Sequence, residues 1–163
     1  MSAISYTTIA SPIGPLILAA TDSGLHQILF VNGRHPAAPD PTWQEDAQPL
    51  QEPVRQLRAY FAGELESFTV PLAPQGTTFQ LKIWQLLRHI PFGETISYGE
   101  LARRAGNPKA SRAVGLANGS NPLPIIIPCH RVIGSTGKLT GYGGGLPIKE
   151  KLLALERRQL SLL

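Results

Sequence analysis

The sequence predicts an α/β protein of the α+β kind: a small β-rich N-terminal domain with one or two helices, then a mainly α-helical C-terminal domain containing a helix-turn-helix. Three observations predict this class. Short β-rich runs fill the start of the chain, helix-start patterns recur in the second half, and a proline-containing linker at 71–76 separates the two. We therefore expect one domain over residues 1–75 and a second over residues 76–163.

The first elements are three short strands. Residues 4–9, 15–20 and 25–30 are rich in β-branched and other apolar residues. Residues 11–14 and 22–24 lie between them and contain the glycine, proline, serine and aspartate that turns favour. This order predicts a meander of antiparallel hairpins.

The rest of the N-terminal half is more irregular. Residues 34–53 carry five prolines, which indicates a surface loop. A helix that Gly63 stops should follow, because four apolar residues have helical spacing: Val54, Leu57, Tyr60 and Phe61. Residues 68–70 read as one more strand before the linker.

The second half opens with two predicted helices. Thr77 and Gln80 form a capping-box pattern, and an apolar stripe of helical spacing then runs to Pro91: Phe79, Ile83, Leu86, Leu87 and Ile90. Ser97 and Glu100 repeat the capping-box pattern and predict a short helix that Gly106 stops.

A third predicted helix completes the helix-turn-helix. Asn107 followed by Pro108 matches an N-cap with proline at the first helical position, so this helix should run through Ser111 to about Asn118. It is dominated by small side chains, which suit either tight packing against a neighbouring helix or close approach to DNA. A last helix is expected from Pro147, with apolar residues on one face: Ile148, Leu152 and Leu155.

Charge is divided unevenly along the chain. Residues 1–75 carry a net charge of −4 and residues 76–163 a net charge of +8. A basic half fits either a polyanionic partner or a solvated basic surface. No apolar run approaches the ~20 residues of a membrane helix, and the first residues do not resemble a secretory signal. We expect no membrane association and a cytoplasmic, bacterial protein.

The chemistry centres on the single cysteine of the chain. A lone cysteine excludes an internal disulfide and a multi-cysteine zinc site, and its usual state is an inert buried thiol. Cys129, however, follows the strand-like run 125–127 and Pro128, and precedes His130 and Arg131. Both neighbours favour the thiolate, so a nucleophile is the alternative interpretation.

The residues around Cys129 resemble the active-site motif of the O6-alkylguanine-DNA alkyltransferases. The resemblance covers residues 77–163 closely. It rests on five segments in the same order and spacing: Tyr98, Arg112 to Pro122, Pro128 to Val132, Gly141 to Leu146, and Leu152 to Glu156. In the N-terminal half it is limited to the β-rich character and two short motifs, and it implies a ribonuclease-H-like domain.

This resemblance implies direct reversal of DNA damage. Cys129 would irreversibly accept the alkyl group of O6-alkylguanine, with O4-alkylthymine as a further substrate whose use the sequence leaves open. His130 would act as base through a bridging water, since adjacent side chains on an extended segment point apart, and Glu156 would orient His130. Asn121 would hold the arrangement through its side-chain amide, although a turn residue before Pro122 is an equally simple interpretation.

The resemblance also implies how double-stranded DNA is bound. The damaged base must be flipped out of the stack, and Arg112 would fill the gap from a recognition helix in the minor groove. Ser111, Ala113 and Gly115 would contact DNA, and small residues suit a groove only ~6 Å wide. Without the resemblance, tight helix packing explains these residues as well.

A base pocket is the last implied feature. Tyr98 would donate to guanine N3, and Tyr142 and Pro124 would form the walls. The main-chain carbonyls of Cys129 and Val132 would accept from the guanine amino group, and the Gly143 N–H would meet O6. Taken without the resemblance, both tyrosines read as core residues.

No cofactor and no metal are expected. Residues 1–75 lack cysteine, and two histidines would make a poor zinc site. We expect a monomer, with cooperative assembly on DNA left open. A non-catalytic damage sensor would lack the cysteine, a Cys-His hydrolase would not need a DNA-binding helix, and a helix-turn-helix regulator would not need the Pro-Cys-His-Arg segment.

Overall fold

The computed structural model describes residues 3–137, 142 and 144–161 of the chain. The chain divides into two compact units, residues 1–75 and 76–163, and each is considered by itself. The first holds a small sheet and the second is mostly helical, so the predicted α+β class is confirmed. No helix in the described part of the chain is long and apolar enough to cross a bilayer.

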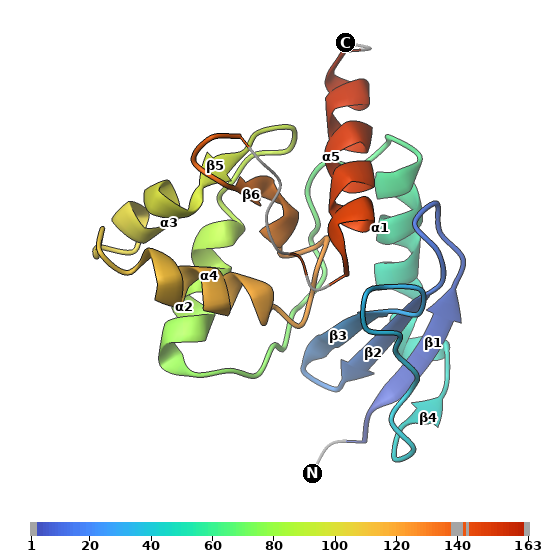
Figure 1. Cartoon of the computed structure of the whole chain (residues 1–163). Helices are drawn as coiled ribbons and strands as arrows, with labels where there is room; N and C mark the ends of the chain where they lie inside the picture. The colour runs from blue at the N-terminus through green and yellow to red at the C-terminus, as the bar shows by residue number, and fades with distance from the viewer. Residues whose placement is uncertain (1–2, 138–141, 143, 162–163) are drawn as a thin grey trace. The chain divides into compact units, whose positions relative to one another are not determined.

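The N-terminal unit is built on a four-stranded sheet of order β3-β2-β1-β4 (Figure 1). The predicted hairpin meander is confirmed, since β1 (Ser5–Ile9), β2 (Leu16–Thr21) and β3 (Gly24–Phe30) pair antiparallel. The short strand β4 (Gln44–Glu45) adds to β1 in parallel and lies inside the predicted loop. Burial of β2 on both faces explains its run of apolar residues without alternation.

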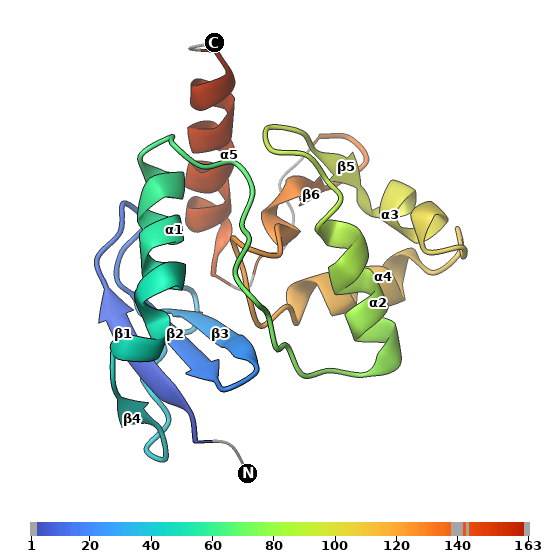
Figure 2. The ribbon, with the colours of Figure 1, turned by 180° about the vertical axis from the view of Figure 1, so that it is seen from behind.

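One helix covers a face of this sheet, as both views of the ribbon show (Figure 1 and Figure 2). A 3₁₀ turn η1 (Gln48–Leu50) leads into α1 (Gln51–Phe61), which begins three residues before the predicted apolar spacing. Leu57 and Tyr60 are fully buried, and Gly63 ends the helix with a positive φ of 79° that favours glycine.

The predicted strand at 68–70 was wrong. The Thr69 N–H donates to the side-chain Oε1 of Gln56 at 2.9 Å, so a buried glutamine on α1 takes the hydrogen bond that a ladder would use. Pairing with the sheet occurs slightly later, where the Leu25 N–H donates to the Pro71 carbonyl and the Ala73 N–H donates to the Leu25 carbonyl.

The C-terminal unit begins with α2 (Thr78–Leu87) and its confirmed capping box. The Gln80 N–H donates to Thr77 Oγ1 at 3.1 Å, and the Thr77 N–H donates to Gln80 Oε1 at 2.9 Å. The predicted stripe was partly wrong, because Phe79 is 39% exposed. Trp84 is buried in its place, and its indole Nε1–H donates to the Ala117 carbonyl of α4 at 2.8 Å.

The helix pair α3 (Tyr98–Arg104) and α4 (Ser111–Gly119) packs beside α2 (Figure 2). Ser97 caps α3, but the Glu100 carboxylate binds Arg103 and Arg104, so the box is only half formed. The predicted start of α4 was wrong by several residues. Asn107 and the residues after it form a turn, in which its side chain accepts the Lys109 N–H, and α4 starts without a side-chain cap.

Two further elements bring distant segments together. The parallel strands β5 (Ile96–Ser97) and β6 (Val132–Ile133) pair, and the 3₁₀ turn η2 (Cys129–Arg131) runs directly into β6. The last helix is α5 (Leu146–Ser161), which begins one residue before the predicted start. Tyr98 thus follows one strand of the pair, and Cys129 precedes the other.

Removal of the α2 cap should lower stability without touching the site. We expect Thr77→Ala to reduce the free energy of unfolding by about 1 kcal/mol, because it leaves helix N–H groups without an acceptor. Urea unfolding measures the change. Thr78→Ala, at an exposed neighbour outside the cap, is the matched control; equal losses in the two variants would contradict this role of Thr77.

Candidate active site

The segment that carries the cysteine is a buried turn. The residues 125–127 were predicted to be strand-like, and this was wrong: Ile125 has a positive φ of 76°, and the Ile127 N–H donates to the Leu123 carbonyl. A β-branched residue rarely adopts this conformation, so the backbone is strained beside the cysteine. The expected extended segment at Cys129 was also wrong, because residues 129–131 form the turn η2.

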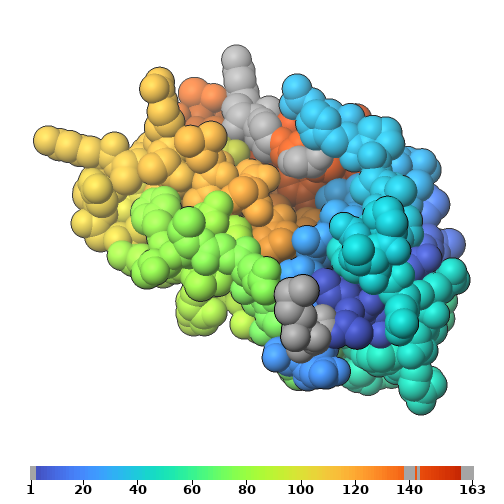
Figure 3. Space-filling view, turned by 90° about the horizontal axis from the view of Figure 1, so that it is seen from below, coloured from blue at the N-terminus to red at the C-terminus, as the bar shows by residue number. Residues whose placement is uncertain are grey.

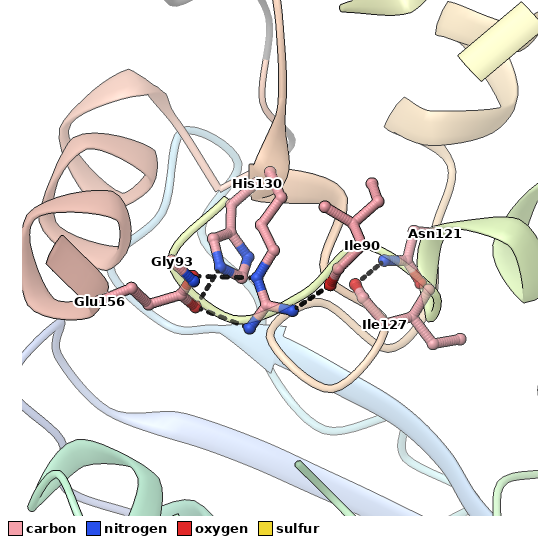
Figure 4. A network of polar contacts seen from close by, with 7 residues as sticks. Ile90, Gly93, Asn121, Ile127, His130 and Glu156 are labelled. Carbon is pink, nitrogen blue, oxygen red and sulfur yellow. Dashed lines mark hydrogen bonds and ion pairs between the residues drawn. The ribbon is translucent and has the colours of Figure 1, made fainter. Parts of the chain in front are cut away.

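Asn121 holds this turn in place. Its side-chain Nδ2 donates to the Ile127 carbonyl at 2.7 Å (Figure 4). Its Oδ1 accepts from the Leu123 N–H at 2.9 Å. Both polar atoms of the amide are therefore used to fix the loop, which offsets the strain at Ile125. The side chain thus holds the turn through its amide, and its contact with the Leu123 N–H is also the local contact of a turn residue.

A buried carboxylate organises the other side of the turn. Glu156 of α5 lies 2.7 Å from His130 Nε2 through Oε2 (Figure 4). Arg131 donates to both carboxylate oxygens, from Nε at 2.9 Å and from Nη2 at 3.0 Å. Arg131 also donates from Nη1 to the Ile90 carbonyl, and the Gly93 N–H donates to Glu156 Oε1. The carboxylate thus ties α5 to two other segments of the unit.

This network decides the tautomer of His130. Burial raises the pKa of Glu156, but hydrogen bonds and charges from His130 and Arg131 outweigh burial and hold the pKa well below its usual range. The ionised carboxylate can only accept, so Nε2 of His130 carries the proton. Burial lowers the pKa of His130 despite the opposing effect of Glu156, so the ring is neutral at neutral pH. Nδ1 then carries a lone pair, and it has no hydrogen-bond partner among the described residues.

Cys129 itself is 5% exposed. Burial raises the pKa of its thiol, and hydrogen bonds from Asn121 and Tyr142 together with the charge of Lys149 partly oppose this rise. The expectation that Arg131 favours the thiolate was wrong, because its guanidinium is taken up by Glu156 and the Ile90 carbonyl. The sulfur therefore depends on a base for its ionisation.

Lys149 was missed in the sequence. It is fully buried, its Nζ donates to the Val132 carbonyl at 2.7 Å and lies 6.0 Å from the centre of the Tyr98 ring. Burial lowers its pKa to about 8. The spacing of Lys149 and Glu156 on α5, seven residues apart, places them on one helix face and could have indicated the lysine.

The predicted DNA-contacting residues lie on or beside the exposed face of α4. Arg112 and Ala113 are exposed, Ser111 opens the helix, and Gly115 is half-buried with the Tyr98 ring beside it. In Figure 3, long side chains of the yellow and gold segments around α3 and the start of α4 stand out from the surface. Ala117, another small residue of this helix, is buried.

The predicted pocket residues are partly placed. Tyr142 and Pro124 are buried, Val132 follows the cysteine turn in β6, and Tyr98 is half-buried at the start of α3. Gly143 lies outside the described residues. Across the described parts of both units, the structure brings together no group of three or more histidine, cysteine, aspartate or glutamate side chains that could hold a metal ion.

Two family models match the chain. The model for the 6-O-methylguanine DNA methyltransferase DNA binding domain matches residues 78–158, and the model for the ribonuclease-like domain of the same protein matches residues 4–74. A methylated-DNA–protein-cysteine methyltransferase of Methanosarcina acetivorans is 56% identical over 151 residues, which cover 93% of this chain and 97% of that protein. The chain belongs to the methylated-DNA–protein-cysteine methyltransferase family.

Other members extend the match to solved structures. The Mycobacterium tuberculosis methylated-DNA–protein-cysteine methyltransferase is 54% identical over 155 residues, which cover 94% of this chain and 93% of that protein. A crystal structure of the Mycobacterium tuberculosis protein OGT in complex with DNA has a TM-score of 0.88 and 52% identity, and covers 95% of this chain and 94% of that one. The family resemblance seen in the motifs is thereby confirmed over both units.

The Glu156 network should make stability depend on pH. The pKa of Glu156 is lower in the folded protein than in the unfolded chain, so its stabilisation is complete above the unfolded carboxyl range and is lost as the pH falls through the folded-state pKa. We expect Glu156→Gln to cost about 3–5 kcal/mol at neutral pH, because Arg131 is left buried without a carboxylate.

Urea unfolding of the wild type and the variant between roughly pH 3 and pH 7 measures both effects. The wild-type free energy of unfolding should fall toward acid pH, and the Glu156→Gln curve should be flatter. Glu150→Gln, at an exposed position on the same helix, should keep the wild-type slope. Parallel curves for all three proteins would exclude Glu156 as the titrating group.

Proposed function

We propose that this chain repairs double-stranded DNA by a single, irreversible transfer of the alkyl group from O6-alkylguanine to its own Cys129. The observation that carries the proposal is the neutral His130 beside Cys129, with Nε2 held by Glu156 and Nδ1 without a partner among the described residues. Such a ring can accept a proton only through Nδ1. Membership of the family supports the same reaction.

The reaction is a nucleophilic displacement at the alkyl carbon. His130 takes the thiol proton at Nδ1 through a bridging water, and the sulfur attacks the carbon attached to guanine O6. The S–C bond forms as the C–O6 bond breaks, and the bonding electron pair leaves with guanine. The guanine anion then takes up one proton, which balances the proton that the thiol gave to His130. The thiol and the alkylguanine have become a thioether and guanine.

The charges around the site suit this sequence of events. Glu156 favours the positive charge that forms on His130 through its hydrogen bond and its negative charge, against the opposing charges of Arg131 and Lys149. The cation of Lys149 favours the thiolate by its charge. Tyr98 is the proposed donor to guanine N3, and Tyr142 and Pro124 are the proposed pocket walls, with Gly143 as the proposed donor to O6.

DNA would reach the site by base flipping. Arg112 on the exposed face of α4 is the proposed residue that fills the gap, with Ser111, Ala113 and Gly115 against the minor groove. The start of α4 lacks a side-chain cap, so its first N–H groups can meet a phosphate. The DNA complex of the Mycobacterium tuberculosis protein supports DNA as the partner. We propose that this chain acts as a monomer in the cytoplasm, where that partner would be found.

The covalent product tests the reaction. When the protein is mixed with duplex DNA that contains O6-methylguanine, its intact mass should rise by one methyl group, and peptide mapping should place that group on Cys129. Cys129→Ser should gain nothing, because a hydroxyl is a far weaker nucleophile than a thiol at neutral pH. A methyl group on any other residue, or an unchanged wild-type mass under reducing conditions, would contradict the proposal.

The role of Arg112 predicts a dependence on the duplex. Arg112→Ala should slow transfer from O6-methylguanine in duplex DNA by about 10- to 100-fold, since flipping costs a few kcal/mol that the side chain helps to offset. Transfer from the free base O6-benzylguanine should fall much less. Rates measured by mass at several salt concentrations check both points, because binding should also weaken as salt rises. Equal slowing with both substrates would assign Arg112 a structural role.

A further inference from the structure

Leu116 of α4 is a large apolar side chain that the fold leaves in solvent. It is 73% exposed, whereas Leu81 of α2 and Leu146 of α5 are 40% and 42% exposed. No sequence motif assigned this residue a role. A single exposed leucine is ordinary by itself, so the residues around it decide whether it has a function.

The neighbours of Leu116 along the helix surface are small. Residues three positions away share its face, and these are Ala113 and Gly119, both exposed. Gly119 has no positive φ, and a Cβ added to it would meet nothing within 4 Å, so neither its backbone nor packing within the described residues calls for glycine. Glycine also weakens a helix relative to alanine. Leu116 therefore stands above a low surface on both sides.

Exposed cations lie beside this face. Arg112 lies one turn before Leu116 on the same side of the helix, and Lys109 precedes the helix. Arg103 of α3 is tied to Glu100, whereas neither of these two cations has an ion-pair partner in the part of the chain that the structure describes. An apolar side chain among unpaired cations suits a polyanion that also presents apolar groups. Duplex DNA is such a polyanion, because deoxyribose carbons lie along its minor groove between the phosphates.

We propose that Leu116 packs against deoxyribose in the minor groove and makes the protein discriminate deoxyribose from ribose. The inference rests on the proposed function, because it requires α4 in the groove of a duplex. A ribonucleotide at this contact presents its 2′-hydroxyl in the minor groove. Leu116, Ala113 and Gly119 have no polar side-chain atom, so the hydroxyl would lose its water without gaining a hydrogen bond.

A contact with a second copy of the chain is the competing explanation for an exposed leucine. In that case a substitution of Leu116 would change self-association and leave discrimination between the two sugars as it was. The ratio of the transfer rates from two duplexes that differ by one hydroxyl group separates these roles, because a general loss of activity cancels in the ratio.

The experiment places single ribonucleotides in a DNA duplex that contains O6-methylguanine. In each duplex one ribonucleotide lies within about four base pairs of the lesion, on either strand, which is the length of duplex that a nine-residue helix spans. Methyl transfer to Cys129 is followed by mass. In the wild type, the ribonucleotide at the contact should slow transfer about 10-fold relative to the all-deoxy duplex, as expected for a hydroxyl that is buried without a partner.

Three variants complete the comparison. Leu116→Gln is similar in size, is a good helix former and brings an amide that can bind the hydroxyl, so the slowing at the same position should fall to about 3-fold or less. Leu116→Met keeps an apolar contact and should retain the wild-type slowing. Leu81→Gln, at an exposed leucine of α2, is the matched control and should also retain it. All three positions are exposed, and circular dichroism checks that each variant folds.

Equal transfer from every duplex by the wild type, or the same slowing in Leu116→Gln as in the wild type, would overturn the inference, while transfer from the all-deoxy duplex leaves the proposed function standing. A loss of self-association in Leu116→Gln, measured by sedimentation, together with unchanged slowing would assign Leu116 to a contact between copies. Failure of the wild type to transfer from the all-deoxy duplex would instead contradict the proposed function itself.

Discussion

One buried carboxylate sets the arrangement of the C-terminal unit. Glu156 accepts from His130, Arg131 and the Gly93 N–H, so a single group on α5 fixes the cysteine turn and the loop that follows α2. A buried ion pair of this kind contributes little net stability compared with apolar packing. Its effect is on specificity: it holds the imidazole in one tautomer, while burial keeps the ring neutral against the opposing effect of Glu156.

The same constraint explains why the thiol can be buried. Burial raises the pKa of the Cys129 thiol, so the sulfur is not permanently ionised and is less readily attacked by oxidants. In the proposed reaction, ionisation depends on His130, whose tautomer is set by Glu156. A protein that is used once benefits from such restraint, because a premature reaction with another electrophile would waste the whole molecule. The strained backbone at Ile125 is tolerated since Asn121 fixes both sides of the turn.

The sequence predicted the features that depend on local chemistry and missed those that depend on distant partners. The first three strands and the capping box of α2 followed from neighbours in the chain. The strand at 68–70 failed because Gln56 captures the Thr69 N–H, and the run at 125–127 failed because Asn121 bends it into a turn. The contacts of His130, Glu156 and Asn121 agree with the motif, whereas Lys149 was missed although its spacing from Glu156 on one helix face could have indicated it.

Helix α4 has two faces: an exposed face that carries the proposed DNA-contacting residues, and a buried face that contacts the cysteine turn. Arg112 is exposed near its start, while Asn118 is buried near its end beside the Cys129 carbonyl. Six residues of α-helix span about 9 Å, which is a fixed distance because Trp84 and the packing of α2 hold the helix rigidly. Tight packing and close approach to DNA were both open for the small residues of this helix, and the structure leaves Ala113 exposed and buries Ala117. Because one helix carries both the exposed Arg112 and the buried Asn118, the face proposed for DNA contact and the cysteine turn keep a fixed separation.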